Sequence, residues 1–311
     1  MMTPAIQTKD LTKVYRSGFL QRKTPALTDL NLEVGAGSIF GFLGPNGAGK
    51  TTTIKLLIGI IHPTSGQGFI FGKPLQSISV KKEIGFLPER PYFYDYLTGY
   101  EFLHFCGALF GFTKKERDMK IVSLLELVSL RGAEQTPLRK YSKGMLQRIG
   151  IAQALINNPK LVIFDEPMSG LDPVGRKEVR DIMLRLKAQG KTVFFSTHVL
   201  ADAEMICDQV GMIVNGRLRN VGNLEEILNP KIESIELTIR GLSPDKMDAL
   251  KSKVTTMTKR GDIVLITVAD EAQLSEVISW TLQQKGMVVS VVPGKESLED
   301  IFMQEIQSKQ S

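Results

Sequence analysis

The sequence predicts an α/β fold arranged around a phosphate-binding loop, and a glycine-rich motif with its flanking segments supports this. The motif begins with the pattern G-x-x-x-x-G-K-[ST], and its residues are Gly44, Pro45, Asn46, Gly47, Ala48, Gly49, Lys50, Thr51 and Thr52. The mostly apolar residues 38–43 before it are typical of a buried strand, and residues 53–59 after it have helical periodicity. Strand, glycine loop and helix follow one another in the order that this motif requires.

Elementary chemistry explains the residue types of the motif. Glycines allow backbone N–H groups to approach phosphate oxygens closely, and the following helix adds free N–H groups and partial positive charge. Lys50 supplies a full charge to the β- and γ-phosphates of a nucleotide, and the Thr51 hydroxyl can ligate Mg²⁺. We therefore predict a site for a nucleotide with Mg²⁺.

The bulk properties define the class of protein. A chain of 311 residues with 42% hydrophobic and 23% charged residues predicts a globular protein of one large or two modest domains. Its net charge of +6 is scattered without a basic stripe, so we expect no specific binding of nucleic acid. Two distant cysteines, Cys106 and Cys207, fit free thiols in a reducing cytosol. No stretch is apolar over the ~18 residues that a membrane span needs, so we expect a cytoplasmic protein that reaches a membrane only through a partner.

The segments before residue 92 contain several expected strands. Residues 5–15, 26–34 and 66–72 have strand patterns, and residues 84–87 form a short strand that runs into Pro88-Glu89-Arg90-Pro91. Tyr15 ends the first strand, where its ring has two interpretations, namely stacking on an adenine base and ordinary packing.

The next segment is rich in aromatic residues. Nine of the chain's 22 Phe, Tyr and Trp residues lie between residues 92 and 112. Thr98-Gly99-Tyr100-Glu101 has the sequence of a capping box that opens a helix through Ala108. We expect about half of the rings to fill the core of a helical subdomain and the rest to form an exposed apolar patch for a partner.

Later segments bring polar side chains to one edge of the predicted sheet. Helices are expected over 115–129 and from Gly144 to the residues before Pro159. The apolar strand 161–164 then delivers Asp165 and Glu166, and the apolar strand 192–197 delivers His198 to the same edge. Adjacent carboxylates there suit Mg²⁺ binding and activation of water.

The pattern changes after residue 230 and predicts a small α+β domain. Strands are expected over 232–240, 262–268 and 287–292, and helices over 244–251, 272–284 and 297–306. This tail has no catalytic motif, and packing, dimerisation and regulation are its expected roles, in that order. We therefore predict domains at 1–229, with a helical subdomain at about 90–158, and at 230–311.

With six motifs in this order, the chain resembles the ATP-binding subunit of an ABC transporter over roughly residues 3–228. The resemblance implies a P-loop NTPase (ABC ATPase) fold with an antiparallel β subdomain and a helical subdomain. It identifies residues 44–51 as the Walker A loop and residues 161–165 as the Walker B strand, followed by Glu166. The family's signature segment, D-loop, switch histidine and adenine-stacking aromatic then correspond to Ser142-Lys143-Gly144, Ser169-Gly170-Leu171-Asp172, His198 and Tyr15.

The resemblance also implies a mechanism and partners. In it, Lys50 and the loop amides hold the phosphates of ATP, and Thr51 and Asp165 hold Mg²⁺, with Glu89 in its outer shell. Glu166 deprotonates the attacking water and His198 contacts the γ-phosphate. Ser142 and Gly144 serve nucleotide bound to a second copy, which implies a head-to-tail homodimer around two ATP molecules. The Glu89 loop, the signature and the extra domain most resemble single-cassette exporter subunits, which work with a separately encoded membrane permease.

The sequence departs from the family at three positions and leaves alternatives open. Glu89 replaces the usual Gln, Lys143 the signature's second Gly, and Met145 its usual Gln. An importer ATPase with a regulatory tail, a soluble ABC ATPase of DNA repair or translation, and a nucleotide-gated module that barely hydrolyses are the rival interpretations. The sequence does not identify the cargo or the permease.

Overall fold

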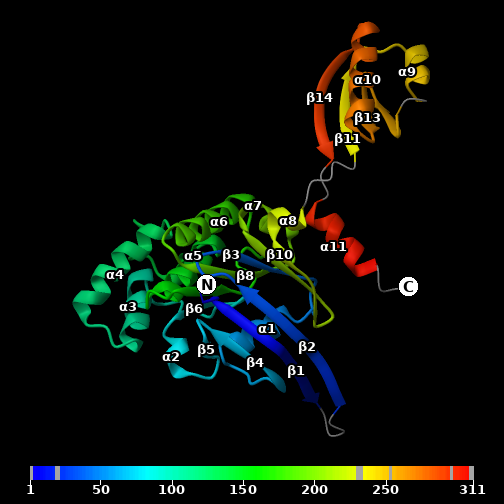
Figure 1. Ribbon diagram of the computed structural model, residues 1–311. Coiled ribbons are helices and arrows are strands. Elements are labelled where there is room, and N and C mark those ends of the chain that lie inside the picture. The colour runs from blue at the N-terminus through cyan, green and yellow to red at the C-terminus, as the bar shows by residue number, and fades with distance from the viewer. Residues whose placement is uncertain (1–2, 18–21, 229–233, 252–253, 295–296, 308–311) are drawn as a thin grey trace. The chain divides into compact units, whose positions relative to one another are not determined.

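The computed structural model describes residues 3–17, 22–228, 234–251, 254–294 and 297–307 (Figure 1). The chain divides into two compact units. The first unit comprises Met1–Leu224 together with Glu305–Ser311, and the second comprises Glu225–Gln304. The domain boundary at 229/230 stays a prediction.

An antiparallel sheet begins the first unit. It has the order β2-β1-β4-β5 and contains β1 (Ile6–Ser17), β2 (Arg22–Val34), β4 (Ser65–Ile70) and β5 (Lys73–Pro74). Ile6 pairs with Val34 on one side and with Ile70 on the other, and all three side chains are buried. The antiparallel β subdomain expected from the sequence is confirmed.

A six-stranded sheet of order β10-β9-β3-β8-β7-β6 forms the centre of the first unit. The strands β3 (Ile39–Leu43), β6 (Ile84–Leu87), β7 (Leu161–Phe164), β8 (Thr192–Thr197) and β9 (Gln209–Val214) run parallel, and β10 (Arg217–Asn223) is an antiparallel edge. Every residue of β3, β7 and β8 is buried because both faces of a parallel sheet are covered. The rings of Phe40 and Phe194 stack 5.5 Å apart in this core.

Helices cover the parallel sheet and form an extension of the first unit. α1 (Lys50–Leu57) contacts the antiparallel sheet, and α6 (Pro173–Ala188) and α7 (Leu200–Ile206) contact β3 and β8. α3 (Gly99–Leu109), α4 (Lys114–Leu127) and α5 (Lys143–Leu155) contact one another in the extension, and α2 (Ile78–Lys81), the 3₁₀ helix η1 (Leu138–Lys140) and α8 (Leu224–Ile227) are short. The predicted capping box at Thr98 is present, and Thr113 forms a second one with Glu116. We did not predict α6, although Asp172 as its N-cap followed by Pro173 is a common start signal.

Both cysteines are free, as the sequence predicts. Burial raises the pKa of the Cys106 thiol to about 11. Burial also raises the pKa of the Cys207 thiol, with a further contribution from the charge of Asp208. Neither thiol is therefore ionised to a useful degree near neutral pH.

The second unit is built on an antiparallel sheet of order β12-β13-β11-β14. Its elements follow one another as β11 (Ser234–Arg240), α9 (Pro244–Lys251), β12 (Thr256–Arg260), β13 (Ile263–Val268), α10 (Glu271–Gln283) and β14 (Met287–Gly294). Alternate residues of β13, namely Val264, Ile266 and Val268, point into a core that also includes Val277 of α10. The predicted alternation of helix and strand is correct, but β12 was missed, and residues 232–233 of the first predicted strand lie outside the described residues. The last helix, α11, is Leu298–Gln307.

Candidate functional site

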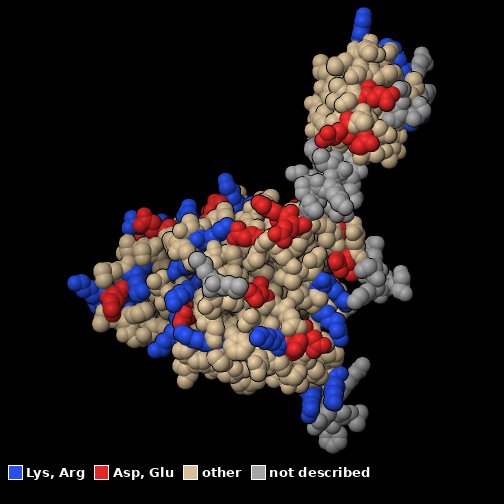
Figure 2. Space-filling view, in the orientation of Figure 1, with Lys and Arg blue, Asp and Glu red and all other residues tan. Residues whose placement is uncertain are grey.

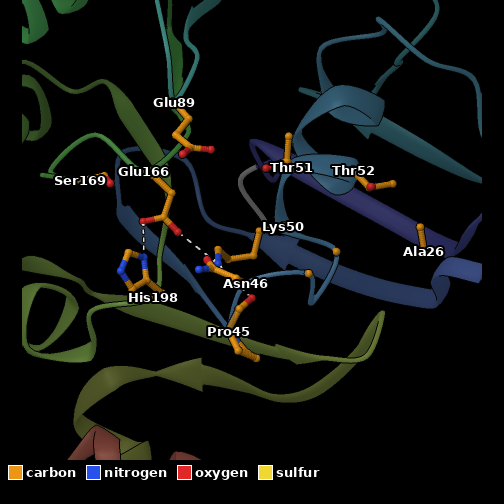
Figure 3. A pocket seen from close by; sticks show the side chains of 12 residues that line it. Ala26, Pro45, Asn46, Lys50, Thr51, Thr52, Glu89, Glu166, Ser169 and His198 are labelled. Carbon is orange, nitrogen blue, oxygen red and sulfur yellow. Dashed lines mark hydrogen bonds and ion pairs between the residues drawn. The ribbon is translucent and has the colours of Figure 1, made fainter.

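The glycine loop between β3 and α1 lines a pocket of about 420 Å³ (Figure 3). This volume is within the range of small-molecule sites. Loop, helix and sheet edge all contribute to the lining, which consists of Ala26, Pro45, Asn46, Gly47, Gly49, Lys50, Thr51, Thr52, Glu89, Glu166, Ser169 and His198. The structure therefore brings together most of the residues that the sequence predicts for phosphate, metal and water.

The loop conformation depends on glycine at position 49. Gly49 has φ 111° and is the residue immediately before the first turn of α1. A Cβ atom there would lie 2.7 Å from the backbone oxygen of Ala26, so any side chain would collide with β2 as well as strain the backbone. Gly44 and Ala48 are buried and do not line the pocket. Their backbone groups fix the loop to neighbouring segments: the Gly44 N–H donates to the backbone oxygen of Thr197, and the Ala48 oxygen accepts from the N–H of Gly216.

Lys50 directs its ammonium group into the loop and towards the sheet edge. Its Nζ atom donates to the backbone oxygens of Gly44 (2.6 Å) and Pro45 (3.2 Å). The same atom lies 3.1 Å from Glu166 Oε1, and both side chains are at least nine-tenths buried. A buried ammonium needs such partners because it has lost its hydration.

Glu166 lies between Lys50 and His198 (Figure 3). Its Oε2 atom is 2.8 Å from Nδ1 of His198, while Oε1 faces Lys50. The backbone of Glu166 has φ 49°, a left-handed conformation that is uncommon for residues other than glycine. The carboxylate that the sequence predicts to activate water is thus held between a lysine and an imidazole.

The residues predicted to hold Mg²⁺ are Thr51, Asp165 and Glu89. Thr51 and Glu89 line the pocket, and Asp165 is buried at the end of β7, where its Oδ1 accepts a hydrogen bond from Ser196 Oγ at 2.6 Å. No group of three His, Cys, Asp or Glu side chains in the described ranges could hold a metal by itself. A hydroxyl and one or two carboxylates nevertheless fit Mg²⁺, which takes its remaining ligands from phosphate and water.

Besides Gly44 and Ala48, three predicted nucleotide-binding residues do not line this pocket. Tyr15 is 37% exposed on β1, does not line the pocket, and has the Lys13 ammonium 5.3 Å from its ring centroid. Ser142 is the N-cap of α5 and accepts from the N–H of Met145, with Gly144 in the first turn. Neither Ser142 nor Gly144 lines the pocket of its own chain.

Sequence reasoning missed two residues of this region. Ala26 lines the pocket from β2, and an alanine in a strand gives no signal in the sequence. Ser196 contacts both Asp165 and Glu166, but β8 also contains the hydroxyl residues Thr192 and Thr197, so no signal in the sequence singled out Ser196. Ser169 of the predicted D-loop also lines the pocket.

An exposed aromatic surface lies in the helical extension. We call it the aromatic patch, and its members are Tyr92, Tyr94, Tyr96, Phe105, Leu109 and Phe110. Tyr94 is its centre, with ring centroids 5.7 Å from Phe105, 6.1 Å from Tyr96 and 6.4 Å from Tyr92. Of the nine rings between residues 92 and 112, five are exposed, Phe93, Tyr100 and Phe112 are intermediate and Phe102 alone is buried, so fewer rings lie in the core than the expected half.

Comparisons with known proteins agree with this geometry. The family model for ABC transporters matches residues 27–169. An uncharacterised ABC transporter ATP-binding protein of Synechocystis sp. is 41% identical over 98% of this chain and 85% of its own length. The chain belongs to the ABC transporter ATP-binding proteins.

Two further relatives are informative about this ABC ATPase. A fluoroquinolones export ATP-binding protein of Mycobacterium tuberculosis is 43% identical over 62% of this chain and 64% of its own length. A solved structure of an ATP-binding subunit of an ABC transporter is 33% identical, with a TM-score of 0.62, over 72% of this chain and 91% of that one. The P-loop NTPase fold predicted from the sequence is confirmed.

In the described ranges, no helix has both the length and the apolar character that a membrane crossing requires. Figure 2 shows basic and acidic side chains interspersed over the viewed face.

Proposed function

We propose that this ABC ATPase powers export through a separately encoded membrane permease, at whose cytoplasmic face it is held. The observation that supports hydrolysis is the convergence of Lys50, Glu166 and His198 on the glycine loop. The M. tuberculosis relative named for fluoroquinolones export supports the direction of transport. The cargo is left to the permease.

The chain's own residues would carry out hydrolysis mostly by positioning and charge stabilisation. Lys50 and the loop N–H groups hold the phosphates of ATP. Glu166 orients a water molecule and accepts its proton as the new P–O bond forms and the bond to the β-phosphate oxygen breaks, a role typically worth ~10²–10⁴-fold. His198, 2.8 Å from the carboxylate, keeps Glu166 in register with the γ-phosphate.

Thr51 and Asp165 would hold Mg²⁺, with Glu89 in its outer shell. When bound, this ion neutralises charge on the β- and γ-phosphates. Ser196 donates to Oδ1 of Asp165, which fixes the direction of the carboxylate. Glu89 lines the pocket with a half-exposed side chain, which suits a contact through water better than a direct one.

Two copies would close head-to-tail around two ATP molecules. Support comes from the position of Ser142 and Gly144 at the N-terminus of the 13-residue helix α5, outside the pocket of their own chain. A helix N-terminus binds anions, so this one is available to nucleotide held by a second copy. Hydrolysis then weakens the contact, and this difference in affinity drives opening.

The aromatic patch is our candidate docking surface for the permease. It follows directly after Glu89, which lines the nucleotide pocket, so the same short segment would sense nucleotide and touch the partner. Exposed aromatic rings that contact one another are typical of interface centres.

A hydrolysis assay tests the core of the proposal. Purified protein should release phosphate from ATP with Mg²⁺ present, and EDTA should abolish release, which excess Mg²⁺ then restores. Release that is unaffected by EDTA would contradict the assignment of Thr51 and Asp165.

A pull-down tests the docking surface. Replacing Tyr94 and Tyr96 by Ala should spare basal hydrolysis of the isolated subunit but weaken its capture by the permease at least ~10-fold, since interface aromatics are frequent hot spots. The matched control replaces the exposed Val174 and Leu184 of α6 by Ala. Equal capture of all three proteins would refute docking at the patch.

A further inference from the structure

Ser196 links the two acidic residues of the site. It lies in β8 with no exposed surface, one position before Thr197 and two before His198. Its Oγ donates to Asp165 Oδ1 at 2.6 Å and accepts from the backbone N–H of Glu166 at 2.9 Å. One hydroxyl therefore bridges neighbouring strands β7 and β8 where their ends meet the pocket.

The direction of both hydrogen bonds is fixed by chemistry. The N–H of Glu166 can only donate, so the serine oxygen accepts there. The single hydroxyl hydrogen is then left for Asp165, whose Oδ1 atom accepts it. Among small side chains that fit this buried position, only one with a hydroxyl can both accept from the Glu166 N–H and donate to Asp165 well.

The backbone N–H that donates to Ser196 belongs to a residue with an unusual conformation. Glu166 has φ 49°, and such left-handed residues persist only where the surroundings determine their conformation. This conformation gives the carboxylate its present direction, between Lys50 and His198. A hydrogen bond to the N–H of that same residue opposes relaxation to ordinary strand geometry.

We propose that Ser196 is a positioning residue for hydrolysis. It fixes Asp165, which would hold Mg²⁺, and Glu166, which would activate water, relative to each other. The inference rests on the proposed function of Asp165 and Glu166. Ser196 does not line the pocket, so it acts only through these two residues. Loss of the hydroxyl would loosen both at once.

The same strand offers a matched control. Thr192, 1% exposed near the start of β8, also accepts a backbone N–H, that of Gly37, at 2.9 Å. Thr192→Val therefore leaves a partly buried N–H without its partner, where Ser196→Ala leaves a buried one, and it does so at the end of the strand away from the acidic residues. A purely structural role for Ser196 predicts that the two variants behave alike.

The first measurement compares steady-state hydrolysis and thermal unfolding. Ser196→Ala should lower kcat about 10- to 100-fold, the range for a small misplacement of reacting groups, with KM for ATP changed less than about 3-fold. Thr192→Val should lower the melting temperature by a similar amount but keep kcat within about 2-fold. Ser196→Cys, a weak donor and acceptor, should have an intermediate kcat. Equal kcat values for Ser196→Ala and Thr192→Val would overturn the proposal.

The second measurement does not depend on turnover. Mn²⁺ is titrated by electron paramagnetic resonance into protein saturated with a non-hydrolysable ATP analogue. Ser196→Ala should raise the Kd for Mn²⁺ at least about 3-fold, because Asp165 has lost its donor, and Thr192→Val should not. Unchanged Mn²⁺ affinity in Ser196→Ala would overturn the link to Asp165. If the natural protein fails to hydrolyse ATP, the proposed function is wrong. The Mn²⁺ titration would still show whether Ser196 positions Asp165.

Discussion

The two units of this ABC ATPase differ in what they bury. Ten buried polar or charged side chains of the described residues lie in the first unit, and only one, Thr281, lies in the second. Four of the ten are charged, namely Lys50, Asp165, Glu166 and Asp202. No charged residue is buried in the described part of the second unit.

Burying charge is costly, and the first unit compensates each charge with specific partners. Lys50, Asp165 and Glu166 contact one another directly or through Ser196 at the pocket. Asp202 of α7 holds Arg176 and Arg180 of α6 at 2.5 and 2.8 Å, so the helix after His198 is tied to the helix after the D-loop. In its described residues, the second unit has an almost wholly apolar core.

Glu166→Gln should have the largest effect on the first unit. It keeps the size of the side chain but removes its ability to accept a proton, so turnover should fall ~10²–10⁴-fold, and ATP-bound dimers should accumulate. Phosphate release and size-exclusion chromatography with ATP measure the two effects. Glu236→Gln, at an exposed site of β11 in the second unit, is the control and should change neither. Near-normal turnover of Glu166→Gln would defeat the assignment.

Asp202→Ala should strongly destabilise the first unit. The change leaves two largely buried guanidinium groups without their counter-charge, at a cost of about 3 kcal/mol in the free energy of unfolding. Urea denaturation followed by far-ultraviolet circular dichroism measures this free energy of unfolding. The control is Asp262→Ala at an exposed site of the second unit. A loss no larger than that of the control would show that this buried charge is not structurally important.

Thr281→Val should have the smallest effect. The Thr281 hydroxyl donates to the backbone oxygen of Val277 at 2.7 Å within its own helix, and valine has nearly the same shape. We expect the free energy of unfolding to fall by at most about 1 kcal/mol, with no change in ATP turnover. Urea denaturation measures this change. A loss as large as that of Asp202→Ala would show that the two units do not differ in how much their buried polar groups contribute to stability.

The sequence was most informative where pattern and chemistry agree locally. The strand Thr192–Thr197 and the helix Pro244–Lys251 have the predicted bounds, since apolar runs and helix signals depend on neighbouring residues. It failed for β12, Thr256–Arg260, which is an edge strand with mostly exposed polar residues and so lacks the alternation that marks a half-buried strand.

The predicted site residues also differ in how directly the sequence indicates them. The glycine loop, Asp165, Glu166 and His198 were predicted because their residue types and spacing suit the chemistry, and the structure places most of them around one pocket. Tyr15, Ser142 and Gly144 lie outside the pocket of their own chain, and the roles of all these residues stay predictions.

The sequence by itself determined the phosphate loop, the acidic strand end and the alternation of elements, because each depends on residues close together in the chain. Only the tertiary structure decided that Ser196 joins Asp165 to Glu166 and that Asp202 joins α7 to α6. Those contacts span 22 to 31 residues and depend on which strands and helices lie side by side. Local periodicity carries no record of such neighbours.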